Sequence, residues 1–90
     1  VLNNSCMGAE KSQQKALHNE KYVGVDLENP RFDKLAEVFG AKGYYAEHPS
    51  EIADTVAEAV KSNAPAVIEI PVQEYFPPSA PTPARNRRLL

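Results

Sequence analysis

The spacing of apolar and polar residues divides the chain into helices and strands. Residues 9–17 are good helix formers with almost no apolar stripe, which predicts a helix that faces solvent, a ligand or a partner subunit. Residues 32–39 place their apolar side chains on one helical face. For this second helix we expect Asn29 as the N-cap, Pro30 at the first helical position and Gly40 as the stop.

The same spacing predicts a third helix and the strands. Residues 43–46 read as a short strand, and residues 66–70 as a nearly continuous apolar strand covered on both faces, with Pro71 ending its pairing. Residues 22–27 form a short apolar segment that is either a strand or an extended loop. The third helix begins at Pro49, with His48 beside its cap. Its inward positions are Ile52, Val56, Ala59 and Val60.

The order of these elements predicts an α/β fold with a mainly parallel sheet flanked by helices and right-handed crossovers. Val1 and Leu2 open the chain as strand residues without any lead-in. Since a lone strand cannot satisfy its edges, neighbouring strands are expected from an upstream segment or from another chain. We therefore predict that residues 1–73 are the C-terminal portion of a larger domain, incomplete as a stand-alone fold.

Composition narrows the function classes. A net charge of −2 over 90 residues argues against nucleic acid as a partner, and one cysteine excludes an internal disulfide framework. The sequence contains no run of about 18 apolar residues, so no membrane span is predicted and a cytoplasmic location is expected. Residues 74–90 are rich in proline and end in arginines, which predicts an extended basic tail.

Asn3 and Asn4 are the strongest candidates for chemistry. They lie where the opening strand ends, just ahead of Gly8, at the strand end where ligands bind in open α/β sheets. A carboxamide oxygen is a hard ligand that Mg²⁺ accepts, together with phosphate oxygens. The alternative is a simple turn, because asparagine tolerates the left-handed conformation and bonds its own backbone.

The chain resembles the C-terminal part of thiamine-diphosphate-dependent enzymes, in the acetolactate synthase and pyruvate decarboxylase superfamily. The resemblance extends over residues 1–76. Its motifs are Asn3-Asn4, Gly8-Ala9-Glu10-Lys11, the run 25–32, Leu35-Ala36, the run 39–43 and the run 65–70.

Within that superfamily, the Gly8-Ala9-Glu10-Lys11 run most resembles the sulfoacetaldehyde acetyltransferases. Acetolactate synthases usually carry Glu-Glu-Gln-Gly-Met-Val after the amides, whereas this chain has residues Ser5 to Glu10 reading SCMGAE. The resemblance thus implies acyl transfer to phosphate. An acetolactate synthase-like carboligase or a 2-oxo acid decarboxylase is the alternative.

The resemblance also implies a ligand set. Asn4 would give its side-chain oxygen and Cys6 its backbone carbonyl to Mg²⁺, and Asn3 would support the turn. These residues, with Met7 and Gly8, would form the segment that binds thiamine diphosphate. The family's remaining protein ligand is the aspartate of an upstream Gly-Asp-Gly run, which these 90 residues do not contain.

Glu10 matches the position where pyruvate decarboxylases carry an active-site glutamate. Burial would raise its pKa toward a useful range, while the helix N-terminus would lower it. The alternative is an exposed glutamate on the first helical turn, and Lys11 has the same ambiguity.

In the family, the glutamate that activates the aminopyrimidine comes from another domain of a neighbouring subunit. The resemblance therefore implies a homodimer or homotetramer with a small-molecule substrate, and an isolated chain that is inactive.

Other reactive residues favour structural roles. His18 and His48 lack the carboxylate support of a zinc pair, and Cys6 would need a cationic neighbour to become a nucleophile. Tyr44 and Tyr45 are interpreted as strand packing. A non-enzymatic reading also stays open: a small α/β interaction module whose polar helix docks on a partner and whose proline-rich tail binds a groove.

Overall fold

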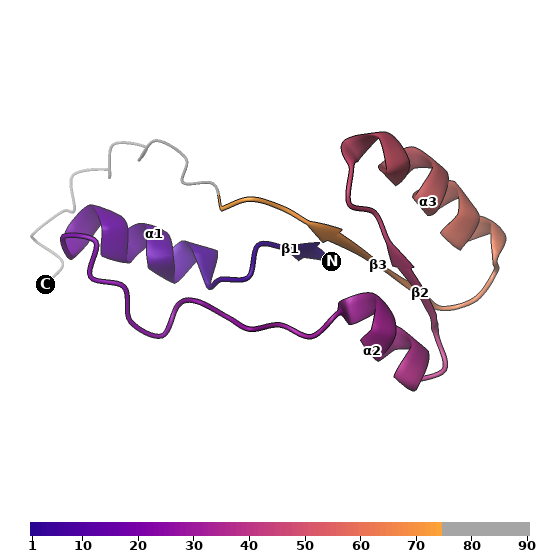
Figure 1. The fold of residues 1–90 in the computed structure, drawn as a ribbon, viewed down its shortest axis with the longest axis horizontal. Helices are drawn as coiled ribbons and strands as arrows, with labels where there is room; N and C mark the ends of the chain where they lie inside the picture. The colour runs from indigo at the N-terminus through magenta and orange to yellow at the C-terminus, as the bar shows by residue number, and fades with distance from the viewer. Residues whose placement is uncertain (75–90) are drawn as a thin grey trace, which may run out of the picture.

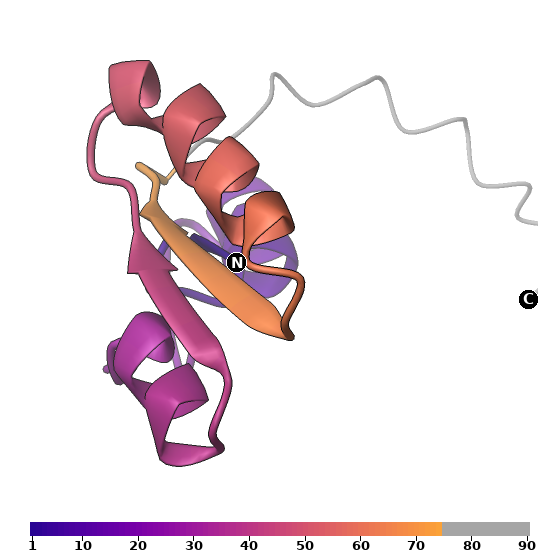
Figure 2. The same cartoon turned by 90° about the vertical axis from the view of Figure 1, so that its right-hand side faces the viewer.

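The computed structural model describes residues 1–74, and the predicted α/β class is confirmed. Within these residues the strands form a parallel sheet in the order β1-β3-β2. Helices α2 and α3 lie on opposite sides of the sheet (Figure 2), while α1 extends beyond the sheet (Figure 1). In chain order the elements are β1 (Leu2–Asn3), α1 (Gly8–Leu17), α2 (Phe32–Val38), β2 (Lys42–Tyr45), α3 (Pro49–Lys61) and β3 (Ala66–Pro71).

Helix α3 starts as the sequence predicts. Pro49 occupies the first turn and His48 is the N-cap residue. The Glu51 carboxylate accepts hydrogen bonds from the backbone N–H groups of His48 at 3.1 Å and Glu47 at 2.9 Å. The bond from the His48 backbone is the main reason why the pKa of Glu51 lies below its ordinary value. His48, expected beside the cap of this helix, is itself the N-cap residue.

The predicted start of α2 is wrong by two residues. The helix begins at Phe32, with Arg31 as the N-cap residue, instead of at Pro30 behind Asn29. Asn29 is otherwise engaged, because its side-chain amide donates to Asn3 Oδ1 at 2.9 Å. The first N–H of the helix, that of Phe32, is instead satisfied by the Glu69 carboxylate of β3 at 2.7 Å. A side chain distant in sequence thus replaces the local cap.

Pro71 does not end the pairing of β3, contrary to the sequence prediction. It belongs to the strand and stands opposite Asn3 of β1. The ladder toward β1 uses the N–H groups of Ile70 and Val72, which donate to the carbonyls of Val1 at 2.8 Å and Asn3 at 2.9 Å. The missing N–H of Pro71 is not needed there, because alternate residues of a strand direct their N–H groups to opposite neighbours.

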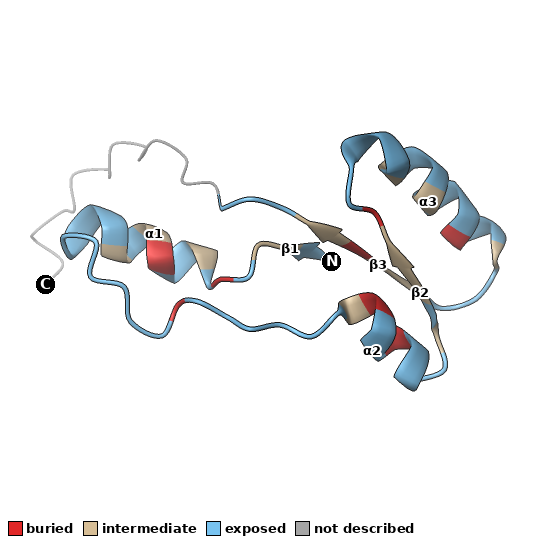
Figure 3. Ribbon diagram, in the orientation of Figure 1, coloured by how far each residue is buried: buried red, intermediate tan, exposed pale blue. Residues whose placement is uncertain are grey.

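Few residues are deeply buried, and they are spread over the helices, β3 and the connecting segments instead of forming one cluster (Figure 3). On α3, Ala59 is buried as predicted, but Val56 and Val60 are 43% and 76% exposed. On α2, Phe39 at the helix end is 81% exposed. The expected inward faces are therefore only partly covered, because the sheet beneath both helices consists of β2 and β3 alone.

Residues 22–27 follow the extended-loop alternative. They form a connector whose ladder contact with the rest of the chain is one antiparallel bridge, between Asp26 and Cys6. Among residues 1–74, none of the helices has the length and apolar character needed to cross a membrane. The predicted tail lies outside the described residues except for Glu74, its first residue.

Candidate functional site

The predicted cofactor segment is a loop at the carboxyl end of β1, which we call the amide loop (residues 3–8). Asn3 is the last residue of β1 and Gly8 the first of α1. The neighbouring strand β3 holds the loop in place, since the Val72 N–H donates to the Asn3 carbonyl at 2.9 Å. The loop therefore lies at the edge of the parallel sheet where ligands bind in open α/β folds.

Two consecutive asparagine turns shape the amide loop. The Ser5 N–H donates to Asn3 Oδ1 at 3.0 Å, and the Cys6 N–H donates to Asn4 Oδ1 at 3.3 Å. Ser5 adopts a φ of 55°, in the left-handed region that costs a residue with a Cβ about 1 kcal/mol. For Asn4 the turn and the ligand role are compatible, because its carbonyl oxygen accepts one bond and keeps a second lone pair, whereas Asn3 Oδ1 also accepts from Asn29 Nδ2 and is fully used.

The connector directs the Cys6 carbonyl away from itself. The bridge between Cys6 and Asp26 is closed by the Leu27 N–H donating to the Ser5 carbonyl at 2.8 Å and the Met7 N–H donating to the Val25 carbonyl at 2.7 Å. Because the bonds of this bridge are made by the residues on either side of Cys6, the N–H and C=O groups of Cys6 itself point away from the connector. The carbonyl of Cys6 therefore faces the same way as its N–H, toward the side of the Asn4 turn, while the buried thiol serves packing.

Gly8 lets the Asn4 side chain lie against the start of α1. A Cβ at Gly8 would come within 3.2 Å of Asn4 Nδ2, closer than ordinary van der Waals contact. The N-cap residue of α1 is Met7, whose side chain has no oxygen or nitrogen with which to cap the helix. The N–H groups of the first turn and the positive end of the helix dipole are thus presented beside the Asn4 carboxamide, an arrangement suited to anions.

Lys11 ties α1 to the rest of the chain. Its ammonium group pairs with Asp26 at 2.6 Å and with Glu74 at 2.7 Å, and it stands 5.2 Å from the ring centroid of Tyr22. Hydrogen bonds to Asp26, and then to Glu74, raise the pKa of Lys11 far above its ordinary value. A lysine held so firmly in its charged form is an anchor and not a proton donor at neutral pH.

Glu10 lies on the first turn of α1, as predicted, and its side chain is exposed within the described residues. It neighbours Lys11 in sequence but points elsewhere, since Lys11 is buried. Any enclosure of Glu10 must therefore come from residues outside 1–74. Its catalytic role stays a prediction.

A buried carboxylate that was not predicted, Glu69, lies inside the apolar strand β3. Glu69 is 2% exposed, and its oxygens accept from Asn3 Nδ2 at 2.9 Å and from the Phe32 N–H at 2.7 Å. Arg31 Nε lies 3.7 Å from the same carboxylate. The available signal was the acidic residue itself, since a glutamate in the interior of an apolar strand needs partners.

Next to Glu69, the buried carboxylate of Asp33 pairs with Arg31, whose side chain is half exposed. The guanidinium donates to both carboxylate oxygens of Asp33, at 2.9 and 3.0 Å. It also stacks on Tyr45, with its central carbon 3.7 Å from the ring centroid. Tyr45 therefore packs in the sheet region, as predicted, and supports an arginine.

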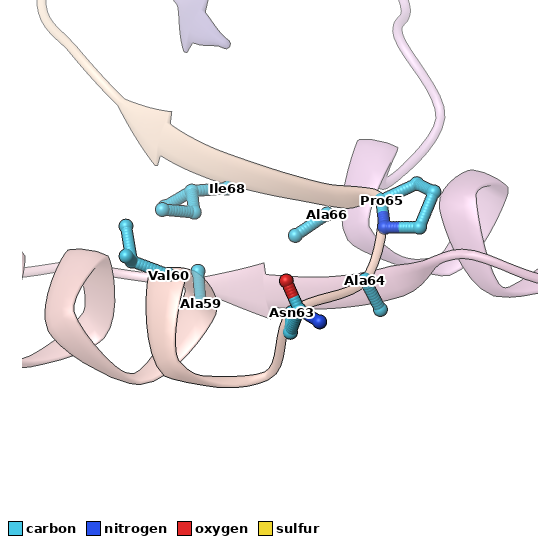
Figure 4. Close-up of a pocket in the computed structure, with 7 residues that line it drawn as sticks. All are labelled: Ala59, Val60, Asn63, Ala64, Pro65, Ala66 and Ile68. Carbon is cyan, nitrogen blue, oxygen red and sulfur yellow. The ribbon is translucent and has the colours of Figure 1, made fainter.

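The remaining candidates do not converge on a site. Within residues 1–74, no three His, Cys, Asp or Glu side chains lie together in a way that could hold a metal ion. An open hollow is lined by Ala59 and Val60 of α3 and by Ala66 and Ile68 of β3 (Figure 4). It lies where β3 begins, whereas the amide loop contacts the end of β3, so this hollow is separate from the predicted cofactor segment.

The fold, the paired amides and the start of α1 are features of one class of protein. Residues 1–70 match the family model described as "Thiamine pyrophosphate enzyme, C-terminal TPP binding domain". The chain belongs to this family, which confirms the resemblance found in the sequence. Thiamine pyrophosphate, also called thiamine diphosphate, is accordingly the cofactor that the family indicates.

Curated relatives agree on the class and differ in reaction. The chain is 31% identical to a sulfoacetaldehyde acetyltransferase of Alcaligenes xylosoxydans xylosoxydans, over 78% of this chain and 12% of that protein. It is 33% identical to an acetolactate synthase of Bacillus subtilis, over 80% of this chain and 12% of that protein. A 2-hydroxyacyl-CoA lyase of Arabidopsis thaliana is 36% identical over 52% of this chain and 8% of that protein. The chain thus spans about one-eighth or less of the length of these relatives.

Proposed function

We propose that the amide loop anchors Mg²⁺ and the diphosphate of thiamine diphosphate in an enzyme acting on 2-oxo acid or aldehyde substrates. Asn4 supplies its side-chain oxygen and Cys6 its backbone carbonyl to the metal. Asn3, Met7 and Gly8 complete the segment that binds the cofactor. The observation that carries this proposal is that the Asn4 carboxamide lies against the start of α1 through its Nδ2, so that this amide and the uncapped helix N–H groups are neighbours.

The chemistry of the amide loop and of the start of α1 fits Mg²⁺ and a diphosphate. Mg²⁺ prefers oxygen ligands, and it binds proteins through one or two side chains while phosphate oxygens and water complete its octahedron. Asn4 Oδ1 already accepts one long hydrogen bond of 3.3 Å from the Cys6 N–H and has a second lone pair. The first turn of α1 offers N–H donors and a positive dipole to the diphosphate. Metal and anion are therefore bound by adjacent parts of one loop.

The residues of this chain bind and orient, while the bound thiamine diphosphate supplies the carbon-centred chemistry. The amide loop fixes the diphosphate end of the cofactor, and Lys11 holds α1 in position through Asp26 and Glu74. Glu10 is the side chain we assign to proton transfer, because it lies on the same first turn of α1.

The assignment of Glu10 is tested by Glu10→Gln in the full-length protein. Turnover should fall by about 10²- to 10⁴-fold, which is typical of acid–base groups, with cofactor affinity retained. Glu20→Gln, at another exposed glutamate, is the matched control. Normal turnover in the Glu10→Gln variant would return Glu10 to a solvated position on the helix.

The rest of the enzyme and a second subunit, in a homodimer or homotetramer, are the proposed partners. Apolar residues such as Leu35, Phe39 and Val60 are 40%, 81% and 76% exposed in this chain, and further protein would cover them. The isolated chain is accordingly expected to be inactive. Family membership favours this assembly over a free-standing interaction module.

For the reaction, we favour acyl transfer of the sulfoacetaldehyde acetyltransferase kind. The support is the Gly8-Ala9-Glu10-Lys11 run and the similarity to that relative over most of the chain. Acetolactate synthase-like carboligation and 2-oxo acid decarboxylation are the alternatives, and an acetolactate synthase of similar identity supports the first of them. The full-length protein should be assayed with sulfoacetaldehyde plus phosphate, with pyruvate, and with branched 2-oxo acids. Product formed only from pyruvate would replace the acetyltransferase proposal by a synthase or a decarboxylase.

The metal role is tested by Asn4→Ala in the full-length protein. Mg²⁺-dependent binding of thiamine diphosphate, followed by titration, should weaken by at least about tenfold, while the unfolding midpoint changes little. Gln13→Ala removes an exposed carboxamide from α1 and should leave binding unchanged. Equal affinities for the Asn4→Ala variant and the wild-type protein would remove Asn4 from the metal site.

A further inference from the structure

We infer that Glu69 is a positioning residue for the metal ligands: its buried carboxylate fixes the orientation of the Asn3 carboxamide, and Asn3 fixes the turn that presents Asn4. This inference rests on the proposed magnesium–diphosphate anchor and extends it to a side chain on β3 that binds neither metal nor cofactor. Glu69 is separated from Asn3 by 66 positions in sequence, and the parallel pairing of β1 with β3 brings the two together.

Within residues 1–74, the groups that face the Glu69 carboxylate are all hydrogen-bond donors. Asn3 Nδ2 donates to Oε1 at 2.9 Å, and the Phe32 N–H donates to Oε2 at 2.7 Å. Arg31 Nε lies 3.7 Å from Oε2. Position 69 therefore needs a side chain that accepts at both ends, and among glutamate's close relatives only the carboxylate does so.

This requirement fixes which way the Asn3 carboxamide faces. Because its NH₂ group is bound to Glu69, its Oδ1 points into the amide loop, where it accepts from the Ser5 N–H at 3.0 Å and from Asn29 Nδ2 at 2.9 Å. If the carboxamide were reversed, its NH₂ group would face those two donors and could not accept from them. The Ser5 turn, with its φ of 55°, is therefore supported from β3, and Asn4 follows directly from it.

The same carboxylate joins three segments that meet at the amide loop. It contacts the end of β1 through Asn3 and the start of α2 through Phe32, and it belongs to β3 itself. At 2% exposure it has little solvent to replace these partners. An apolar residue at position 69 would suit the strand but would leave two partly buried donors without acceptors, a costly arrangement.

Glu69→Gln tests the orientation with almost no change in volume. A glutamine has one acceptor and one donor end, and the backbone N–H of Phe32 cannot turn, so the NH₂ group of the new side chain is left facing Asn3. Asn3 must then reverse and lose its bond to the Ser5 N–H. We expect Mg²⁺ affinity, titrated in the full-length protein with excess thiamine diphosphate, to fall about 10- to 100-fold, as for other groups that orient metal ligands.

A reciprocal exchange separates positioning from simple damage. In the double variant Glu69→Gln with Asn3→Asp, the glutamine NH₂ group donates to one carboxylate oxygen of residue 3, and the other oxygen accepts from the Ser5 N–H. Mg²⁺ affinity should return to within about threefold of wild type. Asn3→Asp alone sets two carboxylates against each other and should bind Mg²⁺ weakly. If Asn3→Asp alone binds as well as the double variant, the added charge explains the recovery and the inference fails.

Asp33→Asn is the matched control, because Asp33 is also buried, at 4% exposure, but bonds Arg31 instead of Asn3. It should lower the unfolding midpoint and leave Mg²⁺ affinity unchanged. Amide hydrogen exchange without metal gives an independent readout, since the Ser5 N–H should exchange faster in Glu69→Gln but not in Asp33→Asn. Equal exchange at Ser5, or Mg²⁺ affinity retained in Glu69→Gln, would overturn the inference.

Asn4→Ala measured alongside tells the two failures apart. If Asn4→Ala weakens Mg²⁺ binding and Glu69→Gln does not, the anchor stands and the positioning role is wrong. If neither variant weakens binding, the proposed anchor is wrong and the positioning role fails with it.

Discussion

Two regions of the chain are held together in different ways. The sheet unit (α2, β2, α3 and β3) is joined by strand ladders and by helices lying on the strands (Figure 1). The amide loop is joined to the sheet unit by the short β1 ladder and by side-chain hydrogen bonds such as Asn3 to Glu69, and Lys11 ties α1 to Glu74 just beyond β3. The first region depends on how closely backbones approach each other, and the second on which side chain accepts from which donor. Substitutions should therefore damage stability in one region and ligand binding in the other.

Gly43→Ala should have the largest effect, through the sheet unit. A Cβ at Gly43 would overlap the backbone carbonyl of Asp33 on α2, a contact that no side-chain movement can relieve. We expect a loss of about 3 kcal/mol or of the fold itself, measured by urea unfolding of the full-length protein. Gly40→Ala is the control: its φ of 80° is strained for alanine, but its Cβ would meet no atom within 4 Å, so about 1 kcal/mol is expected. Equal losses would mean that α2 and β2 are not in close contact.

Acid should weaken the sheet unit through Asp33. Burial is the largest single influence on the pKa of Asp33 and raises it, but the hydrogen bonds and charge of Arg31 together with the backbone N–H and charge of Lys34 outweigh it, and the net pKa is below the ordinary value of 3.8. A carboxyl group whose pKa is lower in the folded than in the unfolded chain stabilises the fold at higher pH and loses that contribution as the pH falls through the folded pKa. Urea unfolding measured downward from about pH 6 should therefore lose stability below about pH 4. Asp33→Asn should flatten that decline, and an unchanged slope would exclude Asp33 as its source.

The sheet unit was largely predictable from the sequence. Its helices and strands have clear spacing signals, and the errors lie at the ends of elements, where distant residues decide. Asn29 was a reasonable local cap for α2, yet the Phe32 N–H is bound by Glu69, 37 positions away in the chain. Pro71 was a reasonable strand end, yet its missing N–H falls on a side of the ladder that does not need it.

The amide loop was predictable in its residue types but not in its supports. Asn3 and Asn4 stand out because of what a carboxamide can do after a strand. That Glu69 orients Asn3 depends on the register between β1 and β3, which no local pattern encodes. Glu10 is exposed within residues 1–74, as expected for a polar side chain on the first turn of a helix.

Gly8→Ala should separate binding from stability in the amide loop. Alanine favours helix α1 by up to about 1 kcal/mol, so stability should hold or rise. Its Cβ would displace the Asn4 carboxamide by a few tenths of an ångström, and Mg²⁺ affinity should fall on the order of tenfold. Ala9→Gly is the reciprocal control, since it weakens the helix without touching Asn4 and should lower stability more than affinity. Binding that follows stability in both variants would contradict the division between the two regions.

Ser5→Gly should give the smallest effect, and its sign is the informative part. Both bonds of Ser5 in the turn are made by its backbone, to Asn3 Oδ1 and from the Leu27 N–H, so the loss of its exposed side chain removes neither. Glycine adopts a φ of 55° without the steric cost borne by serine, and we expect a gain of about 0.5 kcal/mol in unfolding free energy. Ser50→Gly, in the first turn of α3, should instead lose about 0.5 kcal/mol, because the same change there removes a better helix former. If both substitutions destabilise equally, the left-handed turn at Ser5 is not the conformation that the loop adopts in solution, and the orientation of Asn4 argued from it would have to be rebuilt.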